Sequence, residues 1–260
     1  MKSALFCILL IVYSSYTQAK LMVVNGLTHT FKSDAGAVLN GKIHIKNVGR
    51  IADRMVVYKN DLITDCANSS NFVEPNTHSR SLTNWLTTNV DERILQPNEE
   101  YELLYSIKIP NDSTLRGSYW GVFMIEGNSP LSEERKAGVM ISSKARYAIQ
   151  IITDIGQETP PSLTFDKVDF VSSSDSVKIV KVKLKNEGGV TTRTKMILDL
   201  INSNGEKVST IESVFRRIYP NTCAEYELIL KNVPKGRYEG LLMADYGQDL
   251  YATNIDIDIK

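Results

Sequence analysis

The sequence predicts an all-β protein built from two immunoglobulin-like β-sandwich domains in tandem. Two observations lead to this fold class: apolar and polar residues alternate with a period of two, and one set of short motifs occurs twice in the same order. Hydrophobic residues make up 42% and charged residues 23% of the 260-residue chain, which excludes wholesale disorder. Because 30 basic residues balance 30 acidic ones, bulk charge gives no support for a nucleic-acid partner.

The alternation is typical of half-buried antiparallel strands. Residues 101–109 place Tyr, Leu or Ile at every second position, and residues 180–185 alternate Val or Leu with Lys. Turn signals such as Asn40-Gly41 and residues 186–189 (NEGG) separate these runs, and no stretch shows a convincing helical period. We interpret the lysines at 181–185 as the solvent face of a strand rather than a basic stripe for an anionic polymer.

The internal repeat predicts two copies of one fold. The spacing between matched motifs shrinks along the chain, which indicates longer loops in the first copy. Three matches occur in order: residues 45–49 with 184–188, residues 100–103 with 225–228, and the Gly, Tyr, Gly, Met set at 117, 119, 121 and 124 with that at 236, 238, 240 and 243.

The repeat also divides the chain. We expect the first domain over residues 20–155 and the second over 162–260. The linker is placed at residues 156–161 (GQETPP), because its two prolines disfavour a continuing paired strand.

The first 19 residues are predicted to be a signal peptide. Lys2 is followed by the apolar run Ala4–Tyr13, and the small residues Thr17 and Ala19 precede a cleavage site at Lys20. An anchoring helix is the alternative, but ten apolar residues fall short of the roughly 20 needed to span a bilayer. We therefore expect an exported protein, periplasmic or at the cell surface, without a transmembrane anchor.

Export bears on the two cysteines of the mature chain. Cys66 and Cys223 are able to pair in an oxidising compartment. The alternative, which we favour from sequence, is two separate small thiols, because the residues lie in different halves of the chain.

Several motifs of the first half resemble a known family. Trp85 and residues 94–101 (ILQPNEEY), 107–110 (IKIP) and 116–121 (RGSYWG) resemble the first domain of bacterial envelope proteins that partner WxL-domain proteins and, more distantly, periplasmic pilus chaperones. The resemblance implies an immunoglobulin-like domain whose long strand, at residues 145–151, leads into a second β domain. Two departures stand out: the chain ends at Lys260 without the membrane anchor of the Gram-positive proteins, and the basic pair with which pilus chaperones hold a subunit's terminal carboxylate has no counterpart that we can place. Pilin or peptidoglycan binding is therefore not transferred.

The sequence offers no catalytic, cofactor or metal motif. The three histidines, His29, His44 and His78, are scattered, and we expect His44 to face solvent on a strand. Adjacent carboxylates such as Asp91-Glu92 would point apart on a strand, which is poor geometry for acid–base catalysis. We predict a non-enzymatic protein without catalytic residues, metal or cofactor.

One candidate partner-binding surface remains. If Tyr119 and Phe123 face the core, then Trp120, Val122 and Met124 face outward, and Met140 joins them from a later strand. An aromatic residue with flexible methionines suits an adaptable contact surface. The alternative is that a loop or the second domain covers this face.

These observations predict a chaperone-like or binding protein for envelope or surface-fibre assembly. It would contact another exported or surface protein through the apolar patch and through a strand edge in residues 139–152. The alternative is a carbohydrate- or matrix-binding surface protein, for which cell-wall polysaccharide would stack on Trp85 or Trp120.

Overall fold

The computed structural model describes residues 21–67, 69–127, 132–136, 139–157, 160–172 and 177–259, with the backbone alone at 132–136, 139–143 and 172. The predicted signal peptide, residues 1–19, and its cleavage site at Lys20 lie outside these residues.

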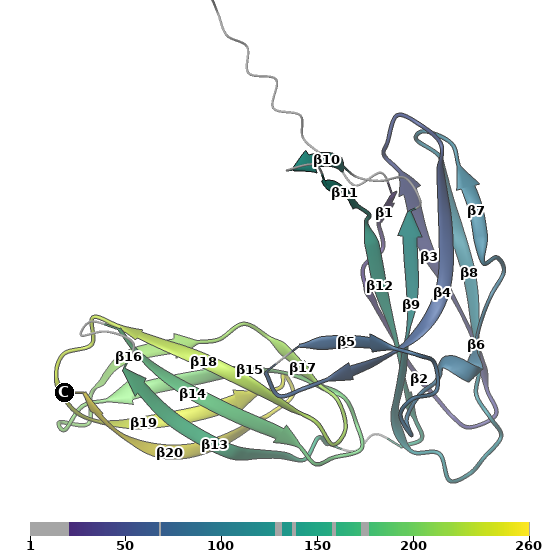
Figure 1. Ribbon diagram of the computed structural model, residues 1–260. Coiled ribbons are helices and arrows are strands. Elements are labelled where there is room, and N and C mark those ends of the chain that lie inside the picture. Colours follow the sequence, from purple (N-terminus) through teal and green to yellow (C-terminus); the bar gives the residue numbers. More distant parts are fainter. Residues whose placement is uncertain are drawn as a thin grey trace, which may run out of the picture.

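The first sandwich consists of two sheets (Figure 1). Its larger sheet runs in the order β2-β12-β9-β4-β5, with β7 paired to β4, and its smaller sheet runs β1-β3-β8-β6. A single-turn 3-10 helix, η1 (Thr83–Trp85), precedes β6. The strands are β1 (Leu21–Val23), β2 (Thr28–Ser33), β3 (Val38–Asn47), β4 (Asp53–Thr64), β5 (Ser70–Val73), β6 (Leu86–Thr88), β7 (Glu92–Leu95), β8 (Glu100–Lys108), β9 (Gly117–Gly127) and β12 (Arg146–Ile155).

The second sandwich is also formed by two sheets. One runs β13-β14-β18, and the other runs β16-β15-β19-β20 with β17 paired to β15. The strands are β13 (Leu163–Ser172), β14 (Val177–Asn186), β15 (Thr192–Ile201), β16 (Lys207–Glu212), β17 (Arg216–Ile218), β18 (Cys223–Lys231), β19 (Gly236–Asp245) and β20 (Leu250–Ile259). The predicted fold class, two immunoglobulin-like sandwiches in tandem, is confirmed.

Between β9 and β12 the chain forms a hairpin of β10 (Ser132–Lys136) and β11 (Val139–Ser143), which pair with each other. The sequence predicted one open strand through residues 139–152. That prediction is wrong, because β11 ends at Ser143 and β12 begins at Arg146.

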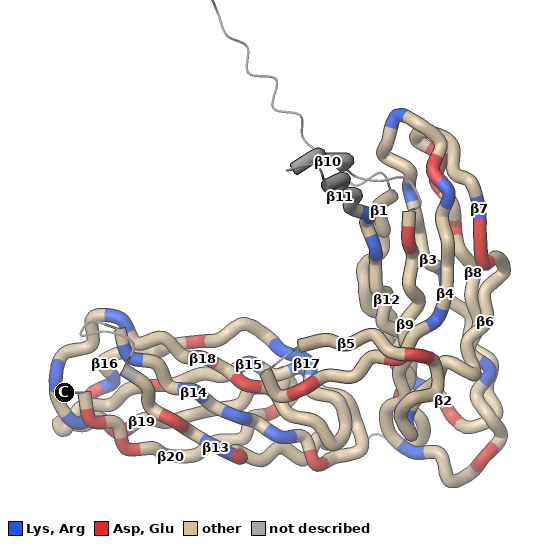
Figure 2. Tube along the Cα trace, in the orientation of Figure 1, with Lys and Arg blue, Asp and Glu red and all other residues tan. Residues whose placement is uncertain are grey.

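The alternation seen in the sequence sorts core from solvent. On β8, Leu103, Tyr105 and Ile107 are buried, and on β14 Val180, Val182 and Leu184 are buried. The intervening lysines of β14 each meet a carboxylate at 2.8–2.9 Å: Lys181 with Glu227, Lys183 with Asp166 and Lys185 with Glu187. Figure 2 shows basic and acidic positions interspersed along the second sandwich. The three pairs form a charge-balanced solvent face, as interpreted from the sequence.

The repeat places a buried asparagine at the end of β3. The Asn47 side chain is fully buried, and its Nδ2 donates to the carbonyl oxygens of Ile51 and Leu95, both at 2.9 Å. Its Oδ1 accepts from Gly49 N at 2.9 Å. One side chain thus satisfies three backbone groups where the chain turns away from β3.

The matched asparagine of β14 makes the same contacts. Asn186 Nδ2 donates to Val190 O at 2.7 Å and to Ile218 O at 3.3 Å, and its Oδ1 accepts from Gly188 N at 3.0 Å. Each buried asparagine also accepts, through its carbonyl, the N–H of the Asn that follows the repeated proline. Those residues, Asn98 (φ 63°) and Asn221 (φ 58°), adopt the left-handed conformation that asparagine tolerates.

The two sandwiches are joined end to side, which gives the molecule an L shape (Figure 1). β12 ends at Ile155 and β13 begins at Leu163. Each sandwich has its own apolar core, one formed by strands up to β12 and the other by strands from β13 onward. The placement of the linker at residues 156–161 stays a prediction.

Candidate functional site

The predicted apolar face of β9 has the expected parity but not the expected exposure. Phe123 packs in the first core, while Trp120, Val122 and Met124 lie on the opposite face of the sheet. Their exposed fractions are 6%, 0% and 1%, so the prediction of a solvent-facing surface is wrong. Met140 lies in β11 and pairs with Arg135 in the backbone, but its side chain is outside the described part of the structure.

Both sandwiches contribute to the cover of Trp120. The Trp120 ring lies between the rings of His78 and Tyr219, with centroid distances of 4.4 and 4.6 Å. Its Nε1 donates to Leu62 O at 2.9 Å. Trp120, Val122 and Met124 form a third apolar cluster with Leu62, Ile152 and Tyr219. The alternative stated from the sequence, cover by a loop or the second domain, therefore describes the structure: His78 belongs to the segment between β5 and η1, and Tyr219 to the second sandwich.

Polar bonds surround this cluster. The Tyr219 hydroxyl donates to Gln150 Oε1 at 2.7 Å. Ser118 N donates to Gly189 O at 2.8 Å, and Thr191 N donates to Ser118 Oγ at 2.6 Å. The junction therefore combines an apolar centre with backbone hydrogen bonds at its rim, as in a stable interface.

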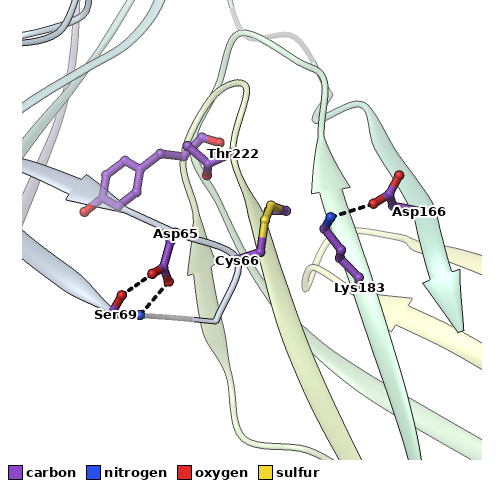
Figure 3. Close-up of a disulfide and its surroundings, with 8 residues drawn as sticks. Asp65, Cys66, Ser69, Asp166, Lys183 and Thr222 are labelled. Carbon is purple, nitrogen blue, oxygen red and sulfur yellow. Dashed lines mark hydrogen bonds and ion pairs between the residues drawn. A yellow bond between two sulfur atoms is a disulfide. The ribbon is translucent and has the colours of Figure 1, made fainter. Parts of the chain in front are cut away.

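A disulfide also crosses the junction. Cys66, in the turn between β4 and β5, is bonded to Cys223, the first residue of β18 (Figure 3). The sequence-based preference for two separate thiols is wrong. The reason is the hairpin of β4 and β5, which extends from the first sandwich toward the second and brings Cys66 O within 2.8 Å of Glu225 N.

A strand edge next to this junction is the best candidate for partner contact. β12 pairs with β9 along its whole length, from Arg146 to Ile155. On its other side it pairs with β2, but only from Gln150 onward. Among the described residues, no strand pairs with Arg146–Ile149 on that side. We call this segment the β12 edge.

The direction of the backbone groups follows from one hydrogen bond. Gln150 N donates to Leu27 O at 2.9 Å, so the N–H and C=O of even-numbered residues in β12 face away from β9. Ala148 and Arg146 therefore present their backbone groups to the open side of the sheet. Such groups can pair with an added strand.

An exposed apolar residue lies beside the β12 edge where β2 begins. The chain from β1 to β2 runs beside it, since the Tyr147 hydroxyl donates to Leu21 O at 2.7 Å and Leu27 contacts Gln150. Along that stretch Met22, Val24 and Leu27 are 41%, 57% and 47% exposed. Met22 and Val24 line a cavity with His44 and Tyr101 on the outer face of the smaller sheet, so Leu27 is the exposed apolar residue tied to β12.

The β12 edge ends at a cavity between the two sandwiches. The cavity has a volume of about 250 Å³ and is lined by Thr28 and Gln150 from the first sandwich and by Arg216, Arg217 and Tyr219 from the second. Burial lowers the pKa of Arg217, and the nearby Arg193 lowers it further, whereas Tyr219 and Asp154 raise it. A guanidinium stays charged under such a shift, and Asp65 also lines the cavity, so two positive charges stand against one negative charge in a partly buried place.

The histidines do not converge. His29 bonds the Tyr105 hydroxyl through Nδ1 at 2.7 Å, His44 lies half-exposed on β3 as expected, and His78 stacks on Trp120. Within the described residues, no group of three or more His, Cys, Asp or Glu side chains is placed to hold a metal ion. In the same part of the chain, no helix has the length and apolar character to cross a membrane.

Comparisons with known proteins identify similar solved structures. No protein-family model matches the sequence, and no curated protein does. The class 5 fimbriae chaperone CfaA is 12% identical with a TM-score of 0.49, covering 92% of this chain and 99% of CfaA. CupB2, a chaperone of Pseudomonas aeruginosa, is 10% identical with a TM-score of 0.44, covering 92% and 100%. A chain of the CsuC–CsuE chaperone–tip subunit complex of Acinetobacter baumannii is 10% identical with a TM-score of 0.43, covering 80% of this chain and 89% of that chain.

Each of these three structures is described as a chaperone or a chaperone complex, two of them of fimbriae or pili, and none is described as a partner of a WxL-domain protein. Likeness at this level says nothing about what this chain binds. Its binding properties are therefore inferred from its own geometry.

Sequence reasoning missed the cavity arginines and the limits of the β12 edge. Arg216-Arg217 stands out in the sequence only as one basic pair among many. The turn Asn25-Gly26, where Gly26 has a φ of 90°, was a usable signal for the limits of the edge. At this turn the chain passes from β1 in the smaller sheet to β2 in the larger sheet, and β2 covers β12 only from there on.

Proposed function

We propose that this chain is an exported, non-enzymatic, chaperone-like binding protein for the assembly of envelope or surface fibres, acting in the periplasm or at the cell surface. Its partner is another exported protein, which adds an extended segment to the β12 edge. The observation that carries the proposal is the difference in pairing on the two sides of β12: complete on the β9 side and beginning only at Gln150 on the other.

Strand addition suits this place for two physical reasons. The outward N–H and C=O groups of Arg146 and Ala148 supply main-chain bonds without sequence preference, and the exposed Leu27 supplies apolar contact. An added strand cannot continue past Ile149 in the same line, because β2 occupies the position beside Gln150.

The cavity gives the added segment a preferred chemistry at that point. Arg216 and Arg217 line the space where the free edge ends. A carboxylate of the partner, either an acidic side chain or a chain terminus, would form charge-assisted hydrogen bonds there. The apolar patch that we predicted on Trp120, Val122 and Met124 has no part in this proposal, because those residues are buried.

The carbohydrate-binding alternative loses its main support. Trp120 is 6% exposed and its ring contacts the rings of His78 and Tyr219, so it offers no platform for a sugar. Trp85 is half-buried and packs on Tyr119 at a centroid distance of 4.9 Å.

The test is recovery of exported partners from the native host by the tagged protein and its variants. Ala148→Pro removes one outward N–H and no bond to β9, so it blocks strand addition; because Ala148 packs against the Trp120 cluster, the thermal stability of the variant is measured alongside. Ala148→Ser keeps that N–H and serves as the matched control. We expect Ala148→Pro to lose the recovered partner and Ala148→Ser to retain it. Equal recovery by both variants, each with wild-type thermal stability, would contradict the proposal.

A further inference from the structure

The junction contains the Cys66–Cys223 disulfide, and we propose that this disulfide is a redox-sensitive brace between the two sandwiches. In the oxidised protein it holds the hairpin of β4 and β5 against β18. Reduction by an exported dithiol, a small molecule or a protein of the thioredoxin type, frees the hairpin while both sandwiches stay folded. The inference goes beyond the proposed function and does not depend on any partner.

The position of the bond makes it a brace rather than a core staple. The two cysteines are 157 positions apart and belong to different sandwiches, with a Cα–Cα distance of 4.7 Å. Neither residue belongs to the apolar core of its own sandwich. Cleavage of the bond therefore removes a link between the sandwiches without opening a cavity inside either.

The tip of the hairpin is closed by hydrogen bonds between Asp65 and Ser69, which lie within the hairpin and do not reach the second sandwich. β5 pairs with β4 over four residue pairs, from Asp61–Val73 to Thr64–Ser70, and Cys66 lies beyond the last pair. Leu62, at the base, packs in the cluster around Trp120. Toward β18, the contacts of the tip described in the structure are the disulfide and the hydrogen bond from Glu225 N to Cys66 O.

The same hairpin forms one wall of the cavity beside the arginines. Thr64, Asp65 and Ser70 line it from the first sandwich, and Cys223 and Arg216 line it from the second. The brace therefore joins two opposite walls. Its redox state sets the freedom of one wall relative to the other.

The chemistry is a thiol–disulfide exchange. A thiolate of the reductant attacks one sulfur of the Cys66–Cys223 bond and releases the other cysteine as a thiolate, which takes up a proton. The second thiol of the reductant then resolves the mixed disulfide. The reductant ends as a disulfide. Cys66 and Cys223 have together gained two electrons and two protons and end as two thiols. Both residues are half-exposed, which gives an attacking thiolate access.

The experiment compares amide hydrogen exchange in the mature full-length chain, oxidised and after treatment with dithiothreitol. We expect exchange in residues 61–73 to accelerate at least about tenfold on reduction, the behaviour of a locally opened segment. Exchange in β8 and β14, which lie in the two cores, should stay unchanged. The double variant Cys66→Ser/Cys223→Ser should match the reduced protein and should not respond to dithiothreitol.

Three results would overturn the brace. Unchanged exchange in residues 61–73 on reduction would show that noncovalent contacts hold the hairpin. Faster exchange throughout β14 and β18 would make the disulfide a requirement for folding of the second sandwich. Two free thiols in the protein isolated from its exported location would show that the bond does not form there.

Discussion

The two sandwiches share a buried framework and differ in what lies on the outer face of the matched strands β9 and β19. Asn47 and Asn186 make equivalent hydrogen bonds in the two copies. On the outer face, however, the repeat aligns Trp120, which is 6% exposed, with Glu239, which is exposed. The inner framework is therefore a property of the fold, and the apolar outer face of β9 is a property of the junction.

Trp120→Ala tests that contrast with the largest expected effect. The substitution removes a large buried ring and its bond to Leu62 O, so we expect a loss of about 3–5 kcal/mol in the free energy of unfolding. At the matched position, Glu239→Ala should change that free energy by less than about 0.5 kcal/mol. Urea denaturation of both variants measures the difference. Similar losses would contradict the assignment of the β9 face to the junction.

The shared framework is tested by Asn47→Ala and Asn186→Ala. Each leaves two carbonyl oxygens and one N–H unsatisfied in or near a core, which we expect to cost about 2–4 kcal/mol. The exposed Asn254→Ala on β20 is the control, with little change expected. If only one of the two substitutions lowered the free energy of unfolding, the two asparagines would not play equivalent roles in the two sandwiches.

Acid should weaken the first sandwich before the second. His29 and His78 have pKa values lowered by burial, and all three histidines of the chain lie in the first sandwich. The folded protein thus favours the neutral rings, and the unfolded chain takes up their protons at higher pH. Stability is complete above about pH 6.5 and falls as the pH drops below it.

This pH dependence is measured by hydrogen exchange between pH 7.5 and 5.5, with corrected intrinsic rates. We expect protection to fall in β8 and β9 while β14 and β19 change less. His78→Gln should reduce the fall. Equal losses in both sandwiches, or a gain on acidification, would contradict the role assigned to the histidines.

Local patterns predicted the faces of the strands but not their neighbours. Alternation identified Leu103, Val182 and the opposite faces of Tyr119 and Trp120 correctly, because the strand period depends only on adjacent residues. The cover of Trp120 comes from Tyr219, about one hundred positions away, and no local pattern encodes such a contact. The pairing of Cys66 with Cys223 was missed for the same reason.

The repeat shows what long-range information a single sequence does hold. The matched Asn47 and Asn186, with their Pro-Asn partners, predicted two copies of one fold, and the structure shows equivalent bonding at both. The repeat carries no signal for the β12 edge, whose limits depend on where β2 begins beside Gln150, after the turn at Asn25-Gly26.

The central claim, that a partner strand adds to the β12 edge, is tested most directly by the exchange rate of the Ala148 amide, measured by NMR with and without the recovered partner. In the free protein we expect Ala148 N–H to exchange quickly and Ile149 N–H, which faces β9, to exchange slowly. With the partner bound, Ala148 should slow by at least about tenfold. An Ala148 amide that stays fast in the complex, with new protection elsewhere, would contradict the account.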